Sequence, residues 1–209
     1  MNKKPESDAL VLAIPESLPE LLYHEFQGEL AVHDIPLRVQ KTPTQIYASL
    51  EWAVPTLVAV YLVKPFLETL LKQAAEDAYP TIKVAFKRLF RPLFGSERES
   101  RHRQISPLLA LYFESREGYV VKALMWEGIP EEVENEVVNQ LFALIKRQYN
   151  SGASIHDTLL VTREELPVQW GRLFLRFNLD KRVWEAVDIM QVARQQRLDR
   201  GLTQPNALK

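Results

Sequence analysis

Apolar residues in the first part of the chain follow first a strand pattern and then a helix pattern. Residues 9–14 are all apolar and end at a proline, which predicts a strand buried inside a sheet. Residues 18–26 carry leucine and phenylalanine at a spacing of three to four, which predicts a short helix that Ser17 caps and Gly28 ends. Residues 37–41 predict a second strand.

A long segment without glycine, residues 44–94, follows these elements. Its apolar and lysine-rich composition predicts a central helical block, and Pro55, Pro65 and Pro80 divide the block because proline fits the first turn of a helix. Two of the spans can equally form one helix that is kinked at Pro65. The predicted helices are 44–52, 55–64, 66–79 and 80–93.

The second half of the chain contains two hairpin patterns on either side of a strongly amphipathic segment. Apolar runs separated by turn residues predict the hairpins, and a proline with carboxylates in the first turn opens the helix between them. The predicted elements are a hairpin of 108–113 and 119–126, a helix over 130–149, a strand at 158–162, and a hairpin of 173–177 and 183–187.

This order of elements predicts the α+β class, with one mixed or antiparallel sheet covered by helices and a proline-punctuated helical block in the middle. No internal repeat and no long linker divides the chain, so we expect a single domain over residues 1–190. Residues 191–209 are polar and predict a C-terminal tail.

Composition narrows the function classes. The chain has 209 residues, of which 46% are apolar, and its net charge is -1, so no global electrostatic field would recruit nucleic acid or an anionic membrane. It contains no cysteine, which excludes disulfides, thiolate metal sites and a cysteine nucleophile. The glycine-rich phosphate loops of nucleotide-binding proteins are also absent from the sequence.

The start of the sequence and its most apolar run both bear on location. The first residues lack the apolar stretch of a secretory signal, so we expect a cytoplasmic protein. Residues 52–63 are the most apolar run, but a membrane span needs about 20 such residues. We therefore expect no membrane span, and predict a buried helix in this run.

The strongest local charge bias lies between residues 83 and 103. Lysines and arginines recur there at helical spacing, opposite an apolar face, which predicts a basic amphipathic helix followed by a charged loop. Such a face can be simply solvated, can contact phosphates, or can bind an acidic protein surface. The candidate partner-binding residues are Lys83, Lys87, Arg88, Arg91, Arg98, Arg101 and Arg103.

Two other groupings carry chemistry that a site could use. Glu20, His24, His33 and Asp34 place histidine and carboxylate groups close together in the sequence, but their spacing matches no established metal motif. The segment 154–157 contains serine, histidine and aspartate, for which the capping of a turn is the better interpretation than a catalytic triad.

One segment resembles a family of uncharacterised bacterial proteins. The residues that carry the likeness lie between positions 46 and 90 and include Glu51-Trp52, Pro55-Thr56, Lys64, Phe66-Leu67, Leu71-Lys72, Asp77, Tyr79 and Lys83. Pro80 departs from the pattern of this family. The resemblance implies a bacterial origin, and it implies no activity, cofactor or site residue.

The sequence therefore favours a non-enzymatic protein that acts by contact with another protein, as an adaptor or assembly component. An acidic surface is the expected complement of the basic segment, no cofactor is expected, and a homo-oligomer stays open. One alternative is a metal-dependent hydrolase that uses Glu20, His24, His33 and Asp34. A second alternative is a nucleic-acid-binding module that uses residues 83–103.

Overall fold

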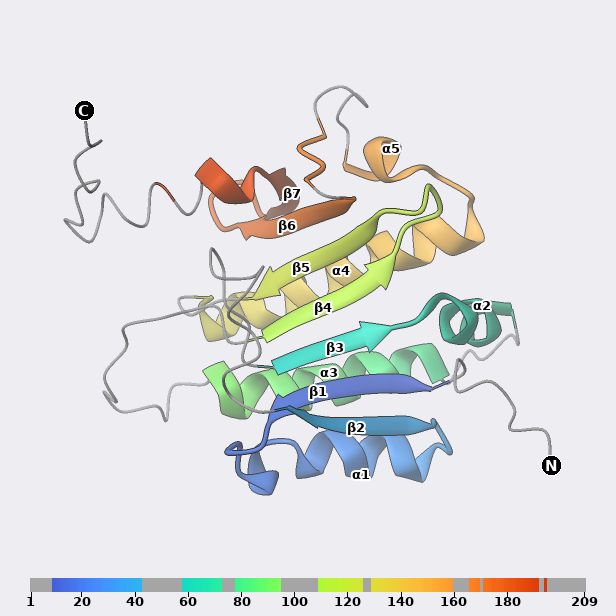
Figure 1. Ribbon diagram of the computed structural model, residues 1–209, viewed down its shortest axis with the longest axis vertical. Coiled ribbons are helices and arrows are strands. Elements are labelled where there is room, and N and C mark those ends of the chain that lie inside the picture. The colour runs from blue at the N-terminus through green and yellow to red at the C-terminus, as the bar shows by residue number, and fades with distance from the viewer. Residues whose placement is uncertain are drawn as a thin grey trace, which may run out of the picture.

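The computed structural model describes residues 9–42, 58–72, 78–94, 109–125, 129–159, 166–169, 171–191 and 194. In this part of the chain seven strands form one sheet, in the order β2-β1-β3-β4-β5-β6-β7 (Figure 1). The strands are β1 (Leu10–Pro15), β2 (Leu37–Thr42), β3 (Val58–Leu62), β4 (Leu109–Glu114), β5 (Val120–Met125), β6 (Arg172–Asn178) and β7 (Val183–Val187). The helices are η2 (Glu20–Leu22), α1 (His24–Val32), α2 (Lys64–Lys72), α3 (Ala78–Phe94), α4 (Glu131–Asn150) and α5 (Ile155–Leu159).

The sheet is mixed, and parallel and antiparallel pairs alternate across it. The pairs β1/β2, β3/β4 and β5/β6 are parallel, whereas β1/β3, β4/β5 and β6/β7 are antiparallel. Each parallel pair is joined by a helical connection, since two parallel neighbours cannot be linked by a tight turn. The fold is therefore α+β with a mixed sheet, as the sequence predicts.

Helices α1, α3 and α4 lie side by side on one face of the sheet (Figure 1). The connections through α1 and α3 have the usual right-handed sense. The connection through α4 starts from a strand of opposite direction, keeps its helix on the same face, and moves along the sheet as the α3 connection does. It is therefore left-handed, which is rare between adjacent parallel strands.

Buried side chains lie on both faces of the sheet. The larger core lies between the sheet and the helices, where Val60 and Leu111 from the strands meet a cluster that includes Phe86 of α3 and Phe142 of α4. The rings of Phe86 and Phe142 pack edge to face, with centroids 5.8 Å apart. The second core, on the opposite face, contains Ala13, Ala59, Ala110, Tyr112, Leu124, Phe174 and Ile189.

The prediction of a helix over residues 55–64 is wrong. Residues Val58–Leu62 form β3, which pairs with both β1 and β4 near the middle of the sheet. A strand buried on both faces has a continuous apolar run, which periodicity cannot distinguish from a buried helix. The β-branched residues Val58 and Val60 favour the strand. The predicted helix at 44–52 lies outside the described residues.

Two further boundaries differ from the sequence prediction. Gly28 does not end the first helix but lies inside α1, which continues to Val32. Residues Ile155–Leu159 form the short helix α5, where the sequence predicted the start of a strand at 158–162. The strand at 9–14, both predicted hairpins and the long helix after Pro130 are confirmed, with shifts of one or two residues. Pro80 lies in the first turn of α3, as expected.

No helix in the described ranges has the length and the apolar character needed to cross a membrane.

Replacing Gly28 by alanine is expected to raise the free energy of unfolding by about 0.5–1 kcal/mol, because glycine loses the most backbone entropy inside a helix. Gly28 is exposed, and an added Cβ would meet no atom within 4 Å. Urea unfolding of wild type and variant measures the difference. A variant less stable than wild type would show that position 28 needs glycine for the fold itself.

Candidate functional site

Helix α3 has one buried face and one solvent-facing side, as its amphipathic sequence predicts. Ile82, Phe86 and Leu89 are at most 1% exposed and pack into the larger core. Lys83 and Lys87 are half-buried and Arg88 is exposed, so all three reach the outer surface of the helical layer. The side chains of this helix therefore divide as the spacing of three to four residues requires.

One cation of this surface is already neutralised within the chain. Arg88 Nη1 lies 2.8 Å from Glu29 Oε2, and this ion pair joins α3 to the neighbouring helix α1. The Arg88 side chain is 47% exposed and the Glu29 side chain 17%, so solvent screens the pair only in part. Arg88 therefore contributes less positive charge to this surface than an unpaired arginine would.

Lys83 and Lys87 are different, because neither forms an ion pair with another residue in the described part of the chain. They stand four residues apart on α3, on successive turns of the same side. Partial burial of Lys87, together with repulsion from Lys83, lowers the pKa of the Lys87 ammonium from its usual value of 10.5. Both effects disfavour the charged form of Lys87, and an anion bound next to the two lysines would counteract them.

The other residues predicted for this surface fall outside the part of the chain that the structure describes. The Arg91 side chain and the residues Arg98, Arg101 and Arg103 lie outside the described residues. The candidate surface consists of Lys83, Lys87 and Arg88, with Val84 between them at 39% exposure.

The histidine and carboxylate grouping does not form a metal site. His24, His33 and Asp34 are exposed at the two ends of α1, and Glu20 lies in the preceding turn. Among the described residues no group of three or more histidine and acidic side chains is placed to hold a metal ion. His24 begins α1 and His33 follows its last residue, so the helix holds the two imidazoles at its opposite ends.

The segment 154–157 caps α5. The Asp157 backbone N–H donates to Ser154 Oγ at 3.2 Å, and the Ser154 hydroxyl donates to the Asp157 carboxylate. This hydrogen bond is the main cause of the lowered pKa of Asp157. Ser154 Oγ and Asp157 both approach the same nitrogen of His156, Nε2, at 3.1 and 3.7 Å. A triad needs serine and aspartate on opposite ring nitrogens, so the arrangement is a cap.

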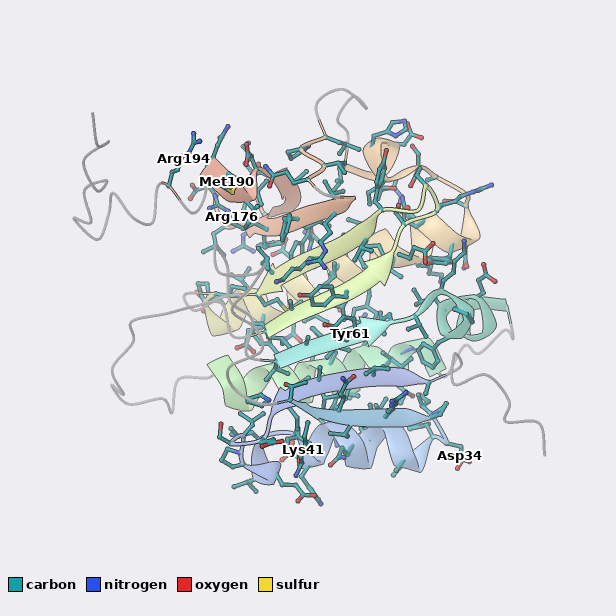
Figure 2. All side chains as sticks on the ribbon, in the orientation of Figure 1. Asp34, Lys41, Tyr61, Arg176, Met190 and Arg194 are labelled. Carbon is teal, nitrogen blue, oxygen red and sulfur yellow. The ribbon has the colours of Figure 1, made fainter. Side chains whose placement is uncertain are left out.

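A buried lysine in the second core is a residue that sequence analysis missed. Tyr61, Tyr112, Lys122 and Phe174 are aligned in one row across four neighbouring strands. Lys122 is fully buried, and its Nζ lies 5.3 Å from the ring centroid of Tyr112 and 6.0 Å from that of Phe174. These distances are those of cation–π contacts. Tyr61, labelled in Figure 2, stacks on Tyr112 with 4.5 Å between centroids.

The sequence feature that indicates this row of side chains is a lysine inside the otherwise apolar strand β5. A charged residue at a buried strand position calls for a compensating partner. The aromatic rings come from strands that are distant in the sequence, so only the sheet register reveals them. Because Lys122 is fully buried, it cannot contact a macromolecular partner directly. The exposed surface of α3 is therefore the stronger candidate for binding.

Comparison of this chain with protein-family models, with curated proteins and with solved structures gave no match.

Proposed function

We propose that this chain is a non-enzymatic protein-interaction component, and that it binds an acidic protein surface through α3. The observation that carries the proposal is the pair Lys83 and Lys87, two cations on one helix side that no described carboxylate neutralises. An acidic partner would supply that missing charge, and complementary charges increase the rate of association and the specificity.

Two features favour a protein over nucleic acid as the partner. The described surface offers two unneutralised lysines, whereas binding to a phosphate backbone relies on many cations distributed along the duplex. Exposed Val84 lies between the lysines, and an apolar residue among charges is typical of protein interfaces. An acidic protein surface is therefore the better-supported partner.

Replacing Lys83 and Lys87 by serine is expected to weaken binding of an oligoglutamate peptide about tenfold, since two charge contacts are lost. Fluorescence anisotropy with labelled oligoglutamate measures the dissociation constant, at low and at physiological salt. Wild-type binding should weaken with salt, because screening shortens the range of the attraction. Thermal unfolding should change little, because both side chains reach the surface.

The matched control is the double variant Lys41→Ser/Lys181→Ser. It makes the same change in net charge at opposite edges of the sheet, on β2 and on the β6–β7 turn, and it should bind the peptide as wild type does. If both double variants bound the peptide equally weakly, the loss of binding would depend on net charge alone, which would contradict the proposal. Tighter binding of a DNA duplex or single strand than of the peptide would favour the nucleic-acid alternative instead.

A further inference from the structure

Helices α1 and α3 present opposite charges on one continuous outer surface. The exposed carboxylates Glu25 and Asp34 of α1 and the turn after it form no ion pair with another described residue. Among the described side chains of α3 the unneutralised groups are the cations Lys83 and Lys87. The ion pair between Glu29 and Arg88 joins the two helices, and the charges of these two side chains in the middle of the surface cancel. The surface is therefore acidic on one side and basic on the other.

Apolar residues on the same surface are unusually exposed. Val32 at the end of α1 is 78% exposed, and Val84 on α3 is 39% exposed. Between Glu25 and Val32 the outer side of α1 carries Gly28, where an added Cβ would meet nothing within 4 Å. Glycine inside a helix costs stability, and nothing packed in the monomer requires it here. A bare helix backbone allows a second helix to approach closely.

We infer that this surface is the interface of a symmetric dimer, in which α1 of each copy packs on α3 of the other. The inference rests on the proposed function, because it names the acidic partner of Lys83 and Lys87 as α1 of a second copy. An acidic helix beside a basic one is complementary to itself, and a two-fold axis brings the opposite charges together twice. A surface of one sign would not have this property.

The register of the two helices supports the pairing. α1 and α3 run antiparallel, as Figure 1 shows, and Glu29 contacts Arg88. Each step forward along α1 therefore corresponds to one step back along α3. Val32 then lies within one residue of the level of Val84, and Asp34 lies at the level of Lys83.

A two-fold axis parallel to the helices keeps these levels. It places Val32 of one copy opposite Val84 of the other, and Asp34 opposite Lys83. Figure 2 labels Asp34 in the turn after α1, and residue 34 is exposed. Val32 thus meets Val84 and Asp34 meets Lys83 in a single arrangement, while Glu25 lies about five residues along the helix from the level of Lys87.

The size of this surface predicts a weak dimer. α1 with its preceding turn and α3 each run for roughly 20 Å, and neighbouring helices lie about 10 Å apart. The footprint is therefore about 400 Å² on each copy, or about 800 Å² in total, which is below the range of stable specific interfaces and typical of weak contacts. We expect a dimer that forms in the micromolar range and weakens as salt is added.

Substitutions that change the charges of α1 and α3 test the inference. Sedimentation velocity over a range of concentrations measures the dissociation constant of the dimer. Lys83→Glu/Lys87→Glu makes α3 acidic, and Glu25→Lys/Asp34→Asn removes the acidic character of α1. Asparagine suits position 34, where φ is 53°. Each variant alone should dimerise at least tenfold more weakly than wild type. Mixing the two should restore dimers in part, because one α1–α3 contact of the mixed pair is the native one, and in the other the acidic α3 no longer faces an acidic α1.

A steric variant provides a second measurement that does not depend on charge. Gly28→Leu adds a side chain where the monomer has open space and removes a glycine from inside a helix, so the variant should fold and be at least as stable as wild type. Its self-association should nevertheless be lost or weakened at least tenfold. The control is Val183→Leu on β7, at the far edge of the sheet, which should dimerise as wild type does.

Wild type that stays monomeric up to high micromolar concentrations would overturn the inference, as would dimers that all these variants leave unchanged. Failure of the mixed variants to associate would also contradict it. These results are distinguishable from failure of the proposed function. If wild type is monomeric but binds oligoglutamate through Lys83 and Lys87, only the dimer is refuted. If wild type neither binds the peptide nor dimerises, the dimer and the proposed function are both refuted.

Discussion

Replacing Val60 by aspartate is expected to lower the free energy of unfolding by more than about 3 kcal/mol, because the carboxylate would lie in the larger core without a compensating partner. Val60 is 1% exposed and lies on β3, near the middle of the sheet. Urea unfolding measures the loss if the variant is soluble, and the fraction of insoluble protein measures it otherwise.

The same substitution at an exposed strand position is the control. Val183 begins β7 at the edge of the sheet and is 42% exposed, so Val183→Asp should cost less than about 1 kcal/mol. A soluble Val60→Asp variant with the stability of wild type would contradict the placement of β3 inside the sheet.

Replacing Trp184 by alanine is expected to cost about 3–5 kcal/mol, the range for removing a large buried aromatic side chain. Trp184 is 6% exposed and packs edge to face on Phe177, with ring centroids 5.7 Å apart. Its indole Nε1–H donates a hydrogen bond to the carbonyl of Val137 at 3.0 Å, which links the edge strand β7 to α4. Tryptophan fluorescence and urea unfolding measure the effect.

The variant Trp184→Phe separates the two contributions. It keeps an aromatic ring in the core but removes the hydrogen bond, so it should cost roughly 1–2 kcal/mol. If the alanine variant cost no more than the phenylalanine variant, the packing of Trp184 against Phe177 and α4 would contribute little to stability.

Local signals were enough to locate much of the fold. The apolar run of β1, the turn residues of both hairpins, and Pro130 with the carboxylates that follow it each depend on neighbours within a few residues. The same holds for the buried face of α3, which the helical spacing of Ile82, Phe86 and Leu89 predicts correctly. Elements of this kind follow from periodicity and turn chemistry alone.

Other features of the fold depend on what surrounds a segment. β3 was mistaken for a helix because a strand covered on both faces loses its alternation of apolar and polar residues. The sequence indicates a helix end at Gly28, but α1 continues past it, because Phe26 and Leu30 on either side of the glycine pack in the core. Tertiary packing outweighed the local propensity at both positions.

The candidate site divides in the same way. The sequence by itself determined that Lys83 and Lys87 share one side of an amphipathic helix, because helix geometry relates residues four positions apart. Only the tertiary structure decided that Arg88 is neutralised by Glu29, that Lys122 lies between the rings of Tyr112 and Phe174, and that an acidic helix lies beside the basic one. These contacts join residues distant in the sequence, and it is the order and register of the strands and helices that brings them together.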